Sequence, residues 1–178
     1  MMQFAPKGRQ DIDWGSTPNT VKPIGISFVP QSLSKVLVHL VFSVKHRHPL
    51  LHDKFRDRLH AYIGGIIRNH KGHLLRAGSV EDHIHLFYVQ PRTSAPCDLV
   101  QAIKADSSAF LRSLAPHLAN FHWQTGYGLF SVSSTHRSQV EAYIDRQREH
   151  HSRENFQDEF RDFLKRYEIE YDERYVWD

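Results

Sequence analysis

The 178-residue sequence contains a single cysteine, Cys97, and has no apolar run near the roughly 20 residues that a membrane-spanning helix needs. A lone cysteine excludes an internal disulfide and a metal site built from several thiolates. The N-terminal residues also lack the charged and then apolar layout of a secretory signal peptide. We therefore expect a soluble, cytoplasmic protein without a membrane partner, in which Cys97 is a small packing residue.

Charge is modest overall but unevenly distributed along the chain. The formal net charge is +3, and the sequence also carries 14 histidines. From Lys35 to Arg76 there are nine Lys and Arg residues against two acidic ones, whereas from Glu154 to Asp178 there are nine acidic residues against four basic ones. For the basic stretch, phosphate contact and a solvated helix face both remain open. The acidic stretch is interpreted as solvated surface.

Proline and glycine concentrate at the N-terminus and interrupt every candidate helix or strand there. They are Pro6, Gly8, Gly15, Pro18, Pro23, Gly25 and Pro30. We expect residues 1–30 to be a disordered or non-native extension. Residues 31–178 then form one domain, for which an apolar content of 40% supplies a single core.

Hydrophobic periodicity predicts alternating strands and helices after this extension. Strands are expected over 36–44, 73–80, 83–90 and 121–134, the last as one strand or a bent pair, and helices over 53–70, 96–114, 138–150 and 155–167. The first strand is apolar at successive positions, which is typical of a strand buried on both faces. Ser138 and Glu141 match a capping box that opens the third helix. This order predicts an α+β, ferredoxin-like fold, with an antiparallel sheet and helices on one face.

Two short patterns carry candidate chemistry. His83 and His85 flank Ile84 in a predicted strand, whose period of two places both imidazoles on one face. Such a pair can hold a metal ion, although a polar pair on a half-exposed strand has the same pattern. Tyr143 and Gln147 lie four residues apart in a predicted helix and so share one face. Taken alone, this second pair is as typical of an ordinary amphipathic helix.

The two patterns in this order, on a strand and on a later helix, are much more specific than either half. From about residue 31 to the C-terminus, the sequence resembles the small single-tyrosine transposases of the HUH class (His, hydrophobic residue, His), which include REP-associated relatives. The residues that carry the resemblance are VHLVFSVKHR at 38–47, PLL at 49–51, EDHIHL at 81–86, QAIK at 101–104, GYG at 126–128, FSVS at 130–133, YIDRQ at 143–147 and HH at 150–151.

The resemblance implies an RRM-like HUH nuclease fold and a role for each chemical residue. His83 and His85 would be ligands of a divalent metal, Mg or Mn, and Gln147 would complete that site. Tyr143 would be the nucleophile that nicks single-stranded DNA, leaving a 5′-phosphotyrosine and a free 3′-hydroxyl. Ligand chemistry alone would also accept Zn or Ni.

The expected partners also follow from the resemblance. They are single-stranded DNA with hairpin ends and a second copy of the chain, in a homodimer whose active sites are composite. Candidate phosphate contacts are Lys45, His46, Arg47 and Lys104. Asp82 is interpreted as a turn residue rather than an orienting partner of His83, and His39 as a buried core histidine.

Two rival functions remain open on the sequence alone. A non-catalytic RNA- or DNA-binding module on the same fold would use exposed aromatic side chains and would need no Gln147. A zinc hydrolase would lose activity to a chelator but not to removal of Tyr143. A covalent protein–DNA adduct on a denaturing gel distinguishes the transposase from both.

Overall fold

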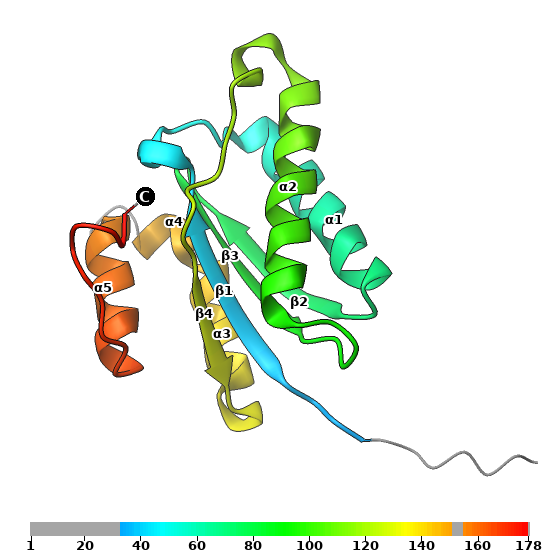
Figure 1. Ribbon diagram of the computed structural model, residues 1–178, viewed down its shortest axis with the longest axis vertical. Coiled ribbons are helices and arrows are strands. Elements are labelled where there is room, and N and C mark those ends of the chain that lie inside the picture. Colours follow the sequence, from blue (N-terminus) through cyan, green and yellow to red (C-terminus); the bar gives the residue numbers. More distant parts are fainter. Residues whose placement is uncertain (1–32, 151–154, 178) are drawn as a thin grey trace, which may run out of the picture. The chain divides into compact units, whose positions relative to one another are not determined.

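The computed structural model describes residues 33–150 and 155–177 (Figure 1). The predicted N-terminal extension, residues 1–30, and His151 lie outside these ranges. The elements are β1 (Leu37–Ser43), η1 (Lys45–Arg47), α1 (Asp53–Asn69), β2 (His73–Ser79), β3 (His83–Val89), α2 (Pro96–Leu114), η2 (Pro116–Leu118), β4 (Gly128–Val132), η3 (Ser134–His136), α3 (Arg137–Asp145), α4 (Gln147–His150) and α5 (Phe156–Arg166). Among the described residues, no helix is long and apolar enough to cross a membrane.

The four strands form one antiparallel sheet in the order β2-β3-β1-β4. Strand β1 lies inside the sheet and all seven of its residues are buried, as its continuous apolar run predicts. It pairs with β3 in a register that sets Val41 opposite His85 and Ser43 opposite His83. The predicted α+β class with an antiparallel sheet is therefore confirmed.

Helices α1 and α2 cover one face of this sheet (Figure 1). Alternate residues of β1 and β3 point into that layer, among them Leu40 and Leu86, and they meet apolar residues of both helices. The helical stripe predicted over 53–70 is buried along α1, and α2 has the predicted bounds. This layer is the main core.

The opposite face carries α3 and α5, beyond the single helical layer expected from the sequence. Val41 and Phe130 of the sheet pack against the phenylalanines of α5, and Leu37 and Phe87 pack against Ile144 of α3. Because residues alternate along β3, the face that holds His83 and His85 is this second face. The candidate histidines thus lie beneath the C-terminal helices.

The prediction of strand over all of 121–134 is wrong for its first half. Only Gly128–Val132 forms β4, while Trp123 makes an isolated bridge with Val44. The aromatic pattern there has another cause, since Phe121 and Trp123 are buried in the main core and Trp123 lies edge-on to Phe42. A loop that fills a core can carry the same residues as a buried strand.

The helix predicted over 138–150 is also corrected. The chain turns earlier, at η3, where the Ser133 hydroxyl accepts a hydrogen bond from the amide of Thr135. Helix α3 follows from Arg137, so Ser138 is not its cap. The helix then breaks at Arg146, whose φ and ψ are −96° and 11°, and α4 begins at Gln147. Tyr143 and Gln147 therefore lie on two successive helices rather than on one.

Candidate active site

His83 and His85 lie side by side on the second face of β3, with their ring centroids 5.1 Å apart. Each ring is oriented through its Nδ1 atom. Asp82 Oδ1 lies 2.6 Å from Nδ1 of His83, and Nε2 of His39 lies 3.0 Å from Nδ1 of His85. The Nε2 atoms of both rings therefore face α5.

These contacts refine two expectations from the sequence. Asp82 does lie in the turn between β2 and β3, but it is also the orienting partner of His83. His39 is buried as expected and is a partner of His85 rather than an isolated core residue.

Burial disfavours the charged forms of His83 and His39. Desolvation is the main cause that lowers the pKa of His83, opposed by its hydrogen bond to Asp82. Desolvation, followed by the nearby His85, lowers the pKa of His39 to about 3. A neutral imidazole has a lone pair available to a cation, so this environment suits metal ligation.

Tyr143, near the end of α3, reaches the same place. Its ring lies edge-on to that of His85, with centroids 5.9 Å apart, and its hydroxyl donates a hydrogen bond to Oε1 of Glu159. Gln147, at the start of α4, is buried and donates from Nε2 to the same Glu159 oxygen over 3.2 Å. All four residues that the sequence assigns to chemistry are thus brought together within one chain, despite the helix break.

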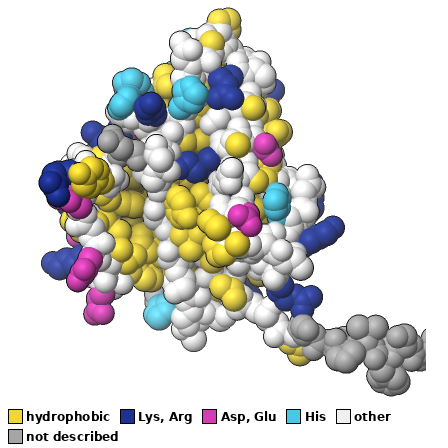
Figure 2. All heavy atoms as spheres, in the orientation of Figure 1, with side chains coloured by type: hydrophobic (Ala, Val, Ile, Leu, Met, Phe, Trp, Pro, Cys, Tyr) yellow, Lys and Arg dark blue, Asp and Glu magenta, His cyan; other side chains and the backbone are white. Residues whose placement is uncertain are grey.

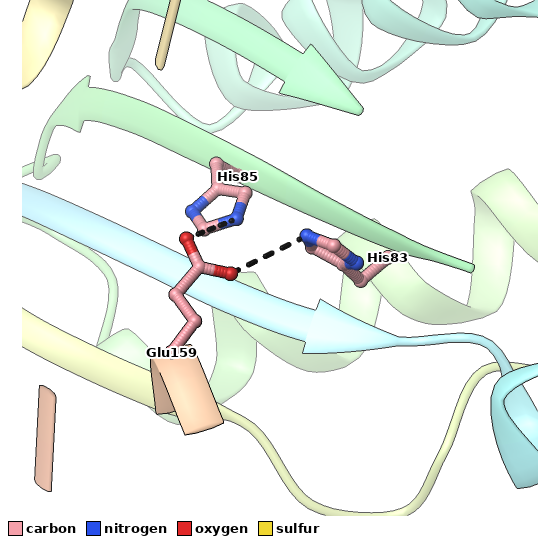
Figure 3. A group of neighbouring side chains, drawn as sticks. All are labelled: His83, His85 and Glu159. Atoms are coloured by element: carbon pink, nitrogen blue, oxygen red, sulfur yellow. Dashed lines mark ion pairs between the residues drawn. The ribbon is translucent and has the colours of Figure 1, made fainter. Parts of the chain in front are cut away.

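Glu159 of α5 is the site residue that the sequence interpretation missed. It is only 3% exposed, so reading the acidic tail as solvated surface is wrong at this position. Its two carboxylate oxygens point at the two histidines, with Oε2 3.6 Å from His83 Nε2 and Oε1 3.5 Å from His85 Nε2 (Figure 3). One signal could have found it, because Glu159 interrupts the apolar stripe formed by Phe156, Phe160 and Phe163.

This group of side chains fits a divalent cation. His83, His85 and Glu159 each offer a ligand atom, and these atoms lie within 4.8 Å of one another. Nε2 of His85 and Oε1 of Gln147 are buried without a hydrogen-bond partner, which is costly unless another group satisfies them. Imidazole nitrogens with carboxylate and amide oxygens are ligands that Mn accepts, and Mg prefers the oxygens.

A cavity of about 670 Å³ leads up to this site between β4, α3 and α5. Tyr143 and Glu159 line it, together with Phe163 and Tyr167. Arg146 and Arg166 add positive charge to its lining, and Asp162 adds negative charge. Tyr143 is thus accessible from this cavity.

The candidate phosphate contacts divide into two groups. Lys45, His46 and Arg47 form η1, which follows β1 after a single intervening residue; the last residue of β1, Ser43, pairs with His83. Figure 2 shows histidine, Lys and Arg side chains gathered at this end of β1. Lys104 instead donates to the carbonyls of Thr125 and Gly126, and burial lowers its pKa to about 8. It ties α2 to the loop before β4.

Comparison with known proteins assigns this chain to a family. The family model described as "Transposase IS200 like" matches residues 32–147, which span β1 to the start of α4. The chain belongs to the IS200-like transposase family. The resemblance found in the sequence is thereby confirmed, and an IS200-like transposase is a DNA-processing enzyme.

Individual relatives agree with this assignment. The IS200-like chain is 27% identical over 114 residues to the ISDra2 transposase TnpA of Deinococcus radiodurans, covering 61% of this chain and 81% of that protein. A solved structure of a candidate transposase from Deinococcus radiodurans matches with a TM-score of 0.52 and 26% identity, over 71% of this chain and 98% of the other. A REP-associated tyrosine transposase bound to a REP hairpin shares the fold, with a TM-score of 0.53 and 15% identity, over 71% of this chain and 74% of the other.

Proposed function

We propose that this transposase nicks and rejoins single-stranded DNA through a 5′-phosphotyrosine on Tyr143, at a site that requires a divalent metal. The observation that carries the proposal is the convergence of the Tyr143 hydroxyl and the two imidazoles on a single buried carboxylate. A nucleophile and a cation site are thus adjacent, which is the arrangement that phosphoryl transfer to a phenol needs.

The chemistry assigned to the chain is simple to balance. The Tyr143 oxygen forms a bond to the scissile phosphorus, and the bond from phosphorus to the 3′-oxygen of the upstream nucleotide breaks. The phenol loses its proton and the departing 3′-oxygen gains one. Attack by a 3′-hydroxyl on the phosphotyrosine reverses these changes, so strands are rejoined without ATP.

His83, His85 and Gln147 would hold the cation, Mg or Mn. When bound, it supplies Lewis-acid polarisation of the phosphate and positive charge near the developing phenolate. The chain's own residues orient and enclose the reactants. Asp82 and His39 hold the two imidazoles in place, and the break at Arg146 separates the helices that carry Tyr143 and Gln147.

The proposed partners are hairpin-ended single-stranded DNA and a second protomer. The fold neighbour bound to a REP hairpin supports a hairpin ligand, and η1 provides Lys45, His46 and Arg47 beside the site. Lys104 can add a contact at the loop before β4. In the homodimer, the helix that bears Tyr143 would complete the His83 and His85 site of the other protomer.

The test is covalent capture. Native protein, labelled single-stranded DNA containing a hairpin end, and Mn or Mg should give an adduct that survives a denaturing gel. Tyr143→Phe should abolish the adduct while retaining reversible DNA binding, because only the nucleophilic oxygen is removed. Tyr62→Phe is the matched control, since Tyr62 stacks on Phe110 at the surface of the other layer.

Each result decides between the functions considered. An adduct that persists in Tyr143→Phe would show that another residue is the nucleophile. Reversible binding without any adduct, with either metal, would favour the non-catalytic binding module. Chelator-sensitive cleavage that is indifferent to Tyr143→Phe would favour the hydrolase.

A further inference from the structure

Helix α5 lies outside the part of the chain that the IS200-like family model matches. That match ends at residue 147, whereas α5 spans Phe156–Arg166. The helix nevertheless delivers a buried carboxylate to the centre of the candidate active site. The family's matched segment therefore does not contain every residue of this site.

The packing of α5 fixes the position of that carboxylate. Asn155 caps the helix by accepting a hydrogen bond from the amide of Asp158. Phe156 packs against the ring of His83 with centroids 4.7 Å apart, and Phe163 packs edge-on to His39 at 5.2 Å. Glu159 lies between these two aromatic contacts, so its carboxylate is directed at the imidazoles and shielded from water.

The distances between the Glu159 oxygens and the imidazole nitrogens suit ligands of one common cation better than groups that are hydrogen-bonded to each other. Distances of 3.6 Å to His83 Nε2 and 3.5 Å to His85 Nε2 exceed the usual length of an N–H···O bond. Two ligands that each lie about 2.1 Å from one cation are separated by about 3.0–3.5 Å. Each oxygen also faces a different histidine, so the carboxylate spans the pair.

The negative charge of Glu159 gives a second reason to place a cation beside it. Moving a carboxylate into a protein interior costs several kcal/mol, which an adjacent cation offsets. A divalent cation held between the carboxylate and the imidazoles would supply the compensating positive charge.

We propose that Glu159 of α5 is a protein ligand of the divalent cation, together with His83 and His85, and that the same carboxylate holds the Tyr143 hydroxyl beside it. The inference rests on the proposed metal-dependent function of this site. Gln147, which bonds to Oε1 of Glu159, then adds a neutral amide to a ligand set that already contains one negative charge.

The experiment measures metal binding in the absence of DNA. Calorimetric titration of Mn²⁺ into the full-length native chain is compared with Glu159→Gln, which keeps the shape of the side chain and removes its charge. We expect the dissociation constant to rise at least about tenfold, because losing a charged ligand should cost no less than losing an orienting partner. Asp106→Asn, an exposed change on α2 in the other helical layer, should bind Mn²⁺ as the native chain does.

Thermal unfolding provides an independent readout. A cation that binds only the folded chain raises its melting temperature, so Mn²⁺ should stabilise the native protein more than Glu159→Gln. If Glu159→Gln does not fold, Glu159→Asp replaces it, with the charge kept and the reach shortened, and its affinity should still fall at least severalfold. An Mn²⁺ affinity within twofold of native in the folded variant overturns the assignment.

The result separates this inference from the proposed function. If Mn²⁺ binding depends on Glu159 but native protein never forms a DNA adduct, the metal ligand stands and the nicking activity fails. If the adduct forms and Glu159→Gln binds Mn²⁺ normally, the activity stands and Glu159 is not a ligand.

Discussion

Asp82 shows how a single side chain orients a candidate metal ligand. Its carboxylate bonds Nδ1 of the fully buried His83, which fixes the ring and aims Nε2 at Glu159. We expect Asp82→Asn to weaken Mn²⁺ binding by about 10- to 100-fold, the usual effect of losing such a partner. Calorimetry measures it, with the exposed Asp106→Asn of α2 as control. Equal affinities in the two variants would show that His83 needs no orienting carboxylate.

His60 of α1, which lies away from the candidate site, should make the folded chain less stable in acid. Burial lowers its pKa from 6.5 to about 4, and its Nε2 lies 2.9 Å from the Ser79 hydroxyl. Below pH 6.5 the unfolded chain takes up a proton that the folded chain refuses, so the stability present above 6.5 is lost as pH falls toward 4. Between pH 6.5 and 4, the free energy of unfolding of the native chain should therefore fall with pH more steeply than that of His60→Gln, by up to about 1.4 kcal/mol per pH unit. Urea unfolding at several pH values measures the free energy of unfolding of both proteins. If the two free energies change in parallel with pH, His60 is not the source of the acid sensitivity.

Residues differ in how well their surroundings can be predicted from sequence. The strand period alone correctly places His83 and His85 on one face, because alternation is a local property of the backbone. Glu159 could not be placed in the same way. Its surroundings depend on how α5 packs on a distant sheet, and a carboxylate in an acidic helix is usually solvated.

At the scale of elements, a glycine sets how closely α3 approaches the sheet. A Cβ on Gly78 of β2 would lie 2.7 Å from Cγ2 and 2.8 Å from the carbonyl oxygen of Ile144. Gly78→Ala should therefore push α3 away, lower stability by about 1–3 kcal/mol, and displace the neighbouring Tyr143. We expect DNA adduct formation to fall at least tenfold while Mn²⁺ binding changes less.

The control for this change is another glycine. A Cβ on Gly65 of α1 meets no heavy atom within 4 Å, so Gly65→Ala should raise stability by about 0.5–1 kcal/mol and leave the adduct unchanged. Denaturant unfolding and the adduct gel measure both variants. Native-like adduct formation in Gly78→Ala would show that the reaction does not depend on how closely α3 approaches the sheet.

Element boundaries follow the sequence where local signals and packing agree. Pro96 at the start of α2 and the apolar stripe of α1 define their helices as predicted. The break at Arg146 has no proline or glycine to mark it, and the capping pattern at Ser138 competes with an earlier turn at Ser133. Both depend on how the chain passes from β4 to the second face, which is not a local property.

At the scale of the whole molecule, the second helical layer behaves as one chemical unit. Tyr143, Gln147 and Glu159 all follow η3 in sequence, and Glu159 bonds to both of the others. The two histidines belong to the sheet. If two protomers exchange this layer after β4, each exchanged unit would carry its three groups together and remake the same contacts on the partner's sheet.

The proposed composite site therefore makes a complementation prediction. Tyr143→Phe and His83→Ala proteins, each inactive alone, are mixed under conditions where subunits exchange. Random pairing gives heterodimers as half of all dimers, each with one intact site when Tyr143 acts on the partner's sheet, so about a quarter of native nicking should return.

Glu159→Gln should restore activity with His83→Ala but not with Tyr143→Phe, because Glu159 travels with the tyrosine. If the first mixture stays inactive although mass spectrometry confirms exchange, each chain uses its own tyrosine. If Glu159→Gln instead complements Tyr143→Phe, then α5 stays with its own sheet and only α3 and α4 cross.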